Sequence, residues 1–386
     1  MAEQLLTPPS IAERFDYWLI APERVSVMIG KRAPGEVSYE ESEQSFTRRQ
    51  LLKVEKTAIR DKLQTAKVRA EYLAQINQQL HTLVKKKLAQ AISDTPAILD
   101  KQLNWQDEST DLIDLLTTPS ATISKVEAVA AGMPWLYDEL LKLVNAPQNR
   151  RRDARGMVIV VDTLKTALSF MGIDNVKLVL PALMFRQSIP LITDPFPQVK
   201  HKTMEYAVTC ARTAEAIAPQ FKAQPYPAYL LALLSQLGRS VILKLYFKLF
   251  EQVHFDFLQH AQKAKLRDLH SALTQLVPDP AQCIQLINQH GDKLSLHLFE
   301  QMVFKRVDLH TPMQQFLQEP DDEDALPLTR TLQQSRYYAK FRMLSDAKLF
   351  LEDEAPVFRS GSAISADTFT ALQKQSLSQL PVVAEL

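Results

Sequence analysis

The chain has 386 residues and a formal net charge of +1, and 46% of its residues are hydrophobic while 23% are charged. This length predicts two or three folding units with ample core material, and the near-zero charge gives no global field that would attract nucleic acid or acidic membranes. Only 8 glycines accompany 22 prolines, and no three glycines lie close together, which excludes the glycine-rich phosphate loops of nucleotide-binding folds.

The cysteines and the apolar runs bear on the cellular compartment. Cys210 and Cys283 are far apart and form no CxxC motif, so we expect neither a disulfide framework nor a zinc ribbon. The N-terminus lacks a basic stretch leading into an apolar one, so no signal peptide is expected. The most apolar runs fall short of the roughly 20 residues that cross a bilayer. We therefore expect a cytoplasmic protein with no membrane partner.

The first predicted unit, residues 1–108, carries a long basic helix. Before it, the pattern predicts a short amphipathic helix at Ile11–Ile20 and a strand at Val25–Ile29. Residues 46–92 contain neither glycine nor proline and are mostly strong helix formers. Their apolar residues form one stripe and the other faces are basic, which predicts one long helix or a helix pair. The stripe consists of Leu52, Ile59, Ala66, Leu73 and Leu80, with Leu63, Ala70 and Val84 beside it.

The rest of the chain predicts helices throughout. Residues 109–305 are densely helical in pattern, and frequent prolines cut them into helices of ordinary length. Residues 306–386 form a C-terminal extension with an acidic loop at Glu319–Asp324, a helix near Leu328–Leu351 and a final helix around Asp367–Gln379. With almost no alternating pattern, the fold class is all-α: a multi-helix bundle with an N-terminal helical arm and a C-terminal helical extension.

Three passages in the middle of the chain, read in order, resemble one family. The first contains Met133-Pro134-Trp135 and closes with Leu143-Val144-Asn145-Ala146, and the second has Met171-Gly172 at a helix–helix turn. The third pairs MEYAVTCARTAEAIA with YLLALLSQLGRSVILKL. Together they resemble the HDOD domain, a bacterial signalling relative of the HD-type metal phosphohydrolases, over roughly residues 109–300. The resemblance implies a helical HD-like bundle.

The resemblance also implies which positions would carry the chemistry. In HD phosphohydrolases a histidine on one helix and a His-Asp pair on the next hold metal ions that activate water. In this chain those positions carry Tyr206 and the pair Ser235-Gln236, all neutral and weak ligands. Gly238 and Arg239, which follow the pair in the family, are retained. The resemblance therefore implies a helical scaffold with a degenerate metal site, so we expect no metal, no cofactor and no catalytic residues.

A second candidate site is the basic cluster after the Leu-Val-Asn helix. Arg150, Arg151, Arg152 and Arg155 could contact a phosphate group or an acidic partner, while an exposed, solvated linker is the simpler interpretation. The histidines show no HExxH or HxxxH pair, and so none is assigned a metal.

The leading hypothesis is a non-enzymatic signal-transduction or regulatory scaffold whose HDOD-like domain binds a protein partner. The alternative is a divergent HD-type metal-dependent phosphohydrolase that uses substitute ligands. A further alternative is a nucleic-acid-binding regulator that uses the basic helix, although no recognition motif accompanies the charge and we do not expect nucleic acid as the partner. Residues 46–92 could also join two copies as a short coiled coil, giving a homodimer.

Overall fold

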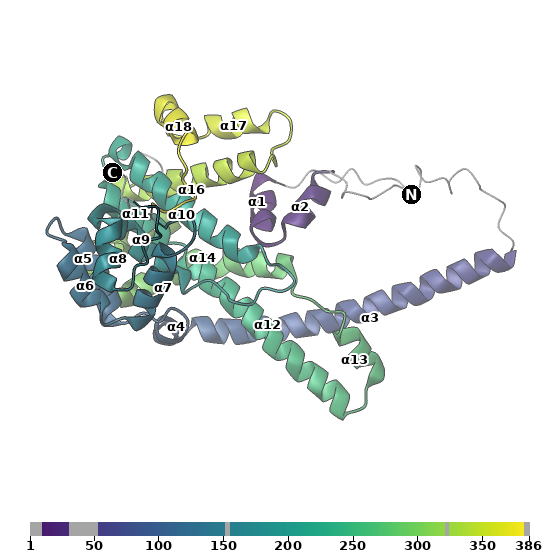
Figure 1. Ribbon diagram of the computed structural model, residues 1–386. Coiled ribbons are helices and arrows are strands. Elements are labelled where there is room, and N and C mark those ends of the chain that lie inside the picture. The colour runs from purple at the N-terminus through teal and green to yellow at the C-terminus, as the bar shows by residue number, and fades with distance from the viewer. Residues whose placement is uncertain (1–9, 31–52, 151–154, 321–323, 382–386) are drawn as a thin grey trace.

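The computed structural model describes residues 10–30, 53–150, 155–320 and 324–381. All regular structure in these ranges is helical, and they contain no strand. The predicted all-α class is thereby confirmed. Figure 1 shows a compact body of helices from which one long helix, α3, extends to one side.

Two short helices, α1 (Ile11–Ile20) and α2 (Pro22–Met28), precede the long one. Ser10 begins α1 with a capping box, in which its hydroxyl accepts a hydrogen bond from the Glu13 backbone N–H and the Glu13 carboxylate accepts one from the Ser10 N–H. The prediction of a strand at Val25–Ile29 was wrong, because this segment is helical. Pro22 fits the first helical position and buried Val25 gives the helix a packing face.

The predicted long helix is one continuous helix, α3 (Lys53–Ile92); the rest of the predicted range, residues 46–52, lies outside the described residues. Its second half packs on α12 (Leu237–Lys263) and buries Leu80, Val84 and Leu88 completely. From Arg60 to Tyr72 the described side chains are exposed to solvent. The described part of the apolar stripe therefore has two environments, because Leu80 and Val84 are buried near the body while Ala66 and Ala70 are exposed along the arm.

Six helices of 7 to 14 residues follow α3 in the chain. They are α4 (Thr95–Lys101), α5 (Asp107–Thr117), α6 (Ile123–Ala130), α7 (Pro134–Val144), α8 (Leu164–Met171) and α9 (Ile173–Arg186). Gly172 separates α8 from α9 with a φ of +75°, a backbone conformation that residues other than glycine rarely adopt. The helix–helix turn expected at Met171-Gly172 is thus present.

The centre of the body consists of long helices that cross one another. They are α10 (Val199–Ile217), α11 (Pro225–Leu234), α12 and α14 (Pro280–Met302). In the chain, the short η3 (Ala218–Phe221) follows α10, and α13 (Arg267–Leu273) follows α12 at its outer end, beside α3 (Figure 1). α12 and α14 approach so closely at Gly238 that a Cβ there would collide with the carbonyl oxygen of Gly291 and lie 2.6 Å from the Ser295 backbone nitrogen. Two glycines therefore set this crossing.

The C-terminal extension is also helical: α15 (His310–Leu317), α16 (Pro327–Asp346), α17 (Glu354–Ser360) and α18 (Ala366–Gln373). The helix predicted to reach Leu351 ends at Asp346, where Lys348 takes a positive φ of +56°, and α18 is shorter than predicted. Part of the acidic loop, residues 321–323, lies outside the described residues. α16 packs against α10 and α11.

One hydrophobic cluster connects all three predicted segments. It contains Phe15 and Leu88 from the first, Tyr206 and Leu243 from the second, and Met343 from the third. The stretch Pro225–Lys263 is long and apolar enough to pass as a membrane span by composition, but 89% of its most apolar window is buried inside the protein. It therefore behaves as core helices do, rather than facing lipid.

Candidate functional site

The three positions predicted to replace metal ligands lie together in the core. Tyr206 is on α10, while Ser235 and Gln236 form the junction that ends α11 and begins α12, and all three are buried. The junction is short because the Ser235 backbone N–H still bonds the Leu231 carbonyl and the Ser240 N–H already bonds the Gln236 carbonyl. The chain thus turns between two helices within two residues. This holds Ser235 and Gln236 against α14 and α16.

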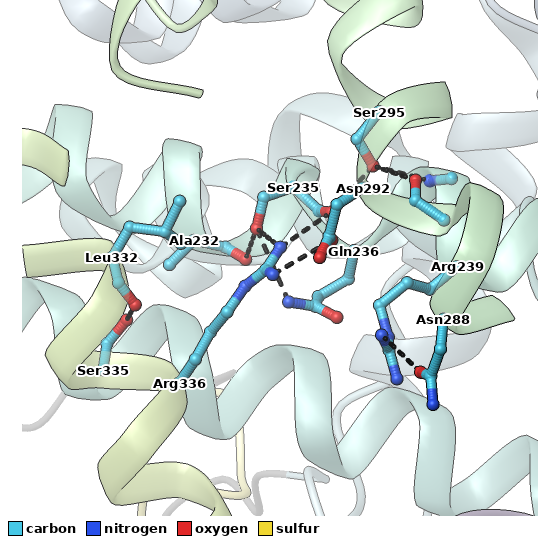
Figure 2. A network of polar contacts seen from close by, with 12 residues as sticks. Ala232, Ser235, Gln236, Arg239, Asn288, Asp292, Ser295, Leu332, Ser335 and Arg336 are labelled. Carbon is cyan, nitrogen blue, oxygen red and sulfur yellow. Dashed lines mark hydrogen bonds and ion pairs between the residues drawn. The ribbon is translucent and has the colours of Figure 1, made fainter. Parts of the chain in front are cut away.

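A guanidinium group contacts Ser235. Arg336 of α16, whose side chain is only 9% exposed, donates from Nη2 to the Ser235 Oγ at 2.9 Å and to its carbonyl oxygen at 3.2 Å. The same guanidinium stacks over the Phe316 ring, 4.6 Å from its centroid. Figure 2 shows Arg336 reaching from α16 toward the α11–α12 junction. A fixed positive charge therefore lies beside Ser235, one of the positions predicted to replace metal ligands.

The counter-ion of this guanidinium comes from α14. Asp292 accepts a hydrogen bond from Arg336 Nη1 at 3.0 Å, and its side chain is 26% exposed. Burial alone would raise the pKa of Asp292, but the charges of Arg336 and Arg239 outweigh it and hold that pKa below its usual value. Asp292 is therefore ionised at neutral pH and committed to the two arginines.

A second arginine, Arg239, lies in the first turn of α12. Arg239 pairs with Asp16 of α1 at 3.5 Å and contacts Asn288 Oδ1 at 3.4 Å. Asn288 also donates to the other oxygen of Asp16 at 2.8 Å. The side chains of Arg239 and Asp16 are 19% and 13% exposed, so this ion pair is well shielded from solvent.

A third cation, Lys340 of α16, completes the cluster. Its ammonium group lies 5.6 Å from the centroid of the Phe15 ring, and no carboxylate in the described part of the chain lies within ion-pair distance of it. Burial lowers the pKa of Lys340, and the charge of Arg239 lowers it further. The cluster therefore holds more positive than negative charge.

A small cavity lies between α1, α10, α12 and α14. Its volume is about 40 Å³, and Tyr206, Gln236, Arg239, Leu243, Ile287 and Asp16 are among its lining residues. This space admits only a few water molecules. Burial raises the pKa of Tyr206 well above its ordinary value, so its hydroxyl stays neutral. The cavity is therefore too small to hold a phosphoester substrate.

Gly238 and Ser295 hold the junction in place from the opposite side. The Ser295 hydroxyl donates to the Ser235 carbonyl at 2.7 Å and accepts from the Gly238 backbone N–H at 2.9 Å. A side chain on Gly238 would displace this bond, because the Ser295 Oγ lies 2.9 Å from the position of a Cβ. The glycine retained from the family pattern thus serves helix packing.

The residues at these positions do not fit a metal ion. Tyr206, Ser235 and Gln236 supply neither imidazole nor carboxylate, and a guanidinium already donates to Ser235. Of the two carboxylates in the cluster, Asp292 is bonded to that guanidinium and Asp16 is paired with Arg239. Among the described residues no three His, Cys, Asp or Glu side chains gather as metal ligands. His290 and His297, both on α14, lie outside the cluster.

The basic cluster at residues 150–155 lies elsewhere, after α7. Exposed Arg150 donates from Nε to the Asn145 carbonyl at 2.7 Å and so serves the C-terminal end of α7. Arg151 and Arg152 lie outside the described residues, and Arg155 is exposed. Asn145 itself holds Val161 by two hydrogen bonds of 2.7 and 2.9 Å, which gives the Leu-Val-Asn motif a structural role.

Sequence reasoning missed four residues of the site: Asp16, Asp292, Arg336 and Lys340. Asp16 sits in an ordinary amphipathic helix. Arg336 and Lys340 lie in the polar helix α16, where nothing in the pattern separates a buried cation from a solvated one. Only Asp292 could have been noticed in the sequence. It directly follows Gly291, and a glycine inside a helix can indicate close packing against another helix.

A family model for the HDOD domain matches residues 106–277. No curated protein and no solved structure matches the chain. The matched segment contains Tyr206, Ser235 and Gln236, and it ends just before α14 begins. This match confirms the resemblance indicated by the three sequence passages: residues 106–277 of the chain match the HDOD domain family.

Proposed function

We propose that this chain is a non-catalytic regulatory scaffold that acts by binding another protein through its HDOD domain and the helices packed on it. The observation that carries the proposal is the bonding of Arg336 to Ser235. Its guanidinium would repel a metal cation, and without a metal nothing at the site lowers the pKa of an attacking water.

The closed cavity supports the same proposal. About 40 Å³ beside Tyr206 and Gln236 holds no phosphoester substrate, whereas ligand pockets usually reach several hundred Å³. Surfaces rather than an internal cavity would then carry the function.

The exposed first half of α3 is one such surface. Its described residues expose the basic side chains of Arg60, Lys62, Lys67 and Arg69, so this part of the helix gains no stability from packing on the body. We include in the proposal that this arm docks on a partner protein or on a second copy of the chain. Nucleic acid is the less favoured ligand because no aromatic or sequence-reading element accompanies the charge.

The test for catalysis is a panel of phosphomonoesters, phosphodiesters and nucleotides incubated with the full chain and excess Mn²⁺. We expect no turnover. Hydrolysis that stops on chelation and that is also lost in Asp292→Asn would contradict the proposal, because Asp292 is bonded to the guanidinium that contacts Ser235.

The test for partner binding is cross-linking and capture with the full chain, compared with surface variants. Deleting residues 1–108 is unsuitable because it removes Phe15, Leu80 and Leu88 from the core. The arm variant is Arg60→Glu with Lys67→Glu, and the matched control reverses exposed Lys263 and Lys374. A partner lost only with the arm variant places docking on α3. A partner retained by both variants places it on the body, and capture of no specific partner counts against the proposal.

Salt dependence separates the nucleic-acid alternative. Binding to duplex or single-stranded nucleic acid that weakens steeply with salt and is lost in the arm variant would favour that alternative. We expect no such binding.

A further inference from the structure

The helix α1 lies on the surface directly over the candidate site. It contacts α10 and α14, and Figure 1 shows α1 and α2 against one side of the body, next to α16. The surface beneath, which we call the α1 groove, is formed by Tyr206 of α10, Arg239 and Leu243 of α12, Ile287 of α14 and Lys340 of α16. The groove is thus covered by a segment that precedes the HDOD domain by about ninety residues in the chain, from Ser10–Ile20 to residue 106.

Consecutive residues of α1 enter the groove as a bound peptide would. Phe15 is buried with its ring edge-on to Tyr206, 4.9 Å between centroids. Asp16 pairs with Arg239 and accepts from Asn288. On the next turn Trp18 lies under the ammonium of Lys202, 4.0 Å from the ring centroid. An aromatic residue followed by a carboxylate therefore provides the central contacts.

The groove itself has an excess of positive charge. Its own cations are Arg239 and Lys340, Arg336 lies beside them in the same cluster, and among the described residues on that side only Asp292 offers these three a carboxylate. Asp16 from α1 supplies a second negative charge and leaves Lys340 without an ion pair in the described part of the chain. Desolvated cations with too few partners favour an added carboxylate, so the groove is complementary to an acidic helix.

The covering helix is weak as an independent unit. α1 has ten residues and α2 has seven, which is too short for either to be stable in water alone. The interaction of α1 therefore amounts to folding on the groove, and a competing helix of the same chemistry could replace it. Outside the groove its main anchor is Arg14, which pairs with Glu354 and donates to the Leu349 carbonyl at 2.8 Å.

We propose that the α1 groove is a docking site for an amphipathic helix in which an aromatic residue is followed by a carboxylate, and that α1 occupies it in cis and competes with such a helix from the partner protein. The identity of the partner rests on the proposed function. The existence of the groove does not, because the chain's own α1 sequence serves as the probe.

The experiment measures the binding of a fluorescent peptide of residues 10–21 to the full chain by anisotropy. Wild-type protein is expected to bind weakly, since its groove is occupied. Asp16→Arg places a third positive group against Arg239 and Lys340 and releases α1, so the peptide should bind about tenfold more tightly or better, in proportion to the fraction of open groove. Phe15→Ala, which removes the ring from Tyr206, should act in the same direction.

Two controls are matched to this design. Glu23→Arg makes the same charge change at an exposed position of α2 and should leave peptide binding at the wild-type level. A peptide that carries Arg in place of Asp16 should not bind the opened variants. Hydrogen exchange of the α1 amides reports independently whether each variant releases the helix.

Every outcome decides the proposal. Tight binding by both opened variants and only by the unmodified peptide supports it. Release of α1 without peptide binding overturns the docking site, and unchanged exchange in both variants overturns the competition in cis because α1 is then a permanent part of the core. Equal binding by wild type and variants also overturns it. None of these results depends on finding the cellular partner, so the failure of the proposed function would be seen separately, in the capture experiment.

Discussion

The HDOD-matched segment and the helices outside it contribute different chemistry to one site. Residues 106–277 supply Tyr206, Ser235 and Gln236, which are neutral, and only one charged member, Arg239. The flanking helices supply the other charges: Asp16 from α1, Asp292 from α14, and Arg336 and Lys340 from α16. The segment that matches the family therefore contributes the neutral residues of the site, and the helices outside that segment contribute most of its charge.

The packing leads to the same conclusion. Gly238 lies inside the matched segment and Gly291 outside it, yet their helices approach to backbone contact. The helices outside the matched segment therefore pack into the same body as the segment itself. The predictions below separate the two regions, beginning with the largest expected effect.

Gly238→Ala should break the contact between the two regions. Its Cβ would meet backbone atoms of Gly291 and Ser295, which cannot move as a flexible side chain can, so we expect a loss of about 3 kcal/mol or more in the free energy of unfolding. Denaturant titration measures it. Gly132→Ala is the matched control, because its nearest contacts lie at 3.3 Å and include a flexible Glu108 side chain. Equal effects for the two variants would contradict the close crossing.

Arg336→Met should remove the charge that the extension places on Ser235. It leaves Asp292 without its closest partner, and we expect a loss of about 2 kcal/mol in unfolding free energy, less than for a fully buried pair because Asp292 is 26% exposed. Arg342→Met on the same helix breaks an exposed pair with Asp346 and should cost under about 1 kcal/mol. A loss no greater than that of the control would show that Arg336 does not organise the site.

Acid should weaken the attachment of the extensions. The pKa of Glu354 is lowered by its hydrogen bond from Arg14, and the pKa of Asp292 is lowered by the arginines once burial is outweighed. The unfolded chain, whose carboxyls keep their ordinary values of 4.5 and 3.8, then binds protons before the folded one does. Stability is therefore fully present above these values and is lost as the pH falls through the folded pKa values.

Denaturant midpoints across this range measure the effect, with Asp292→Asn as the comparison. The variant should show a shallower decline between pH 4.5 and acid conditions than wild type. A steeper decline in the variant would contradict the assignment of Asp292.

Lys340→Met should change the free energy of unfolding least, and it should raise it where the other variants lower it. The wild-type ammonium is half-buried with no ion pair among the described residues, so replacing it by an apolar side chain of similar length should stabilise the protein by about 1 kcal/mol. Thermal unfolding measures the gain. A clear loss of stability would show that Lys340 has a favourable partner, and the charge excess of the α1 groove would then be overstated.

Much of the fold could be predicted from sequence because helix patterns are local. The absence of proline and glycine and the 3.6-residue periodicity predicted the long helix of residues 46–92, of which Lys53–Ile92 is described, and the family resemblance predicted the turn at Gly172. The strand prediction at Val25–Ile29 failed because three β-branched or apolar residues in alternation outweighed the helix start signal of Pro22. Burial of the segment on the body settled its structure.

The sequence predicted the neutral residues of the site but not most of its charged residues. The family resemblance located Tyr206, Ser235 and Gln236, which lie on the scaffold that the family shares. The charged residues come from helices separated from these by up to about two hundred residues, from Asp16 to Gln236, and their association depends on tertiary packing alone. A buried arginine such as Arg336 has the same local pattern as a solvated one.

The central claim is that a guanidinium, and not a metal ion, organises this HDOD site. Equilibrium dialysis of the full chain against Mn²⁺, Fe²⁺ and Zn²⁺ at neutral pH, followed by elemental analysis, tests it most directly, with Asp292→Asn as the comparison. We expect far less than one equivalent of each metal in both proteins. One equivalent bound by wild type and lost in Asp292→Asn would contradict it.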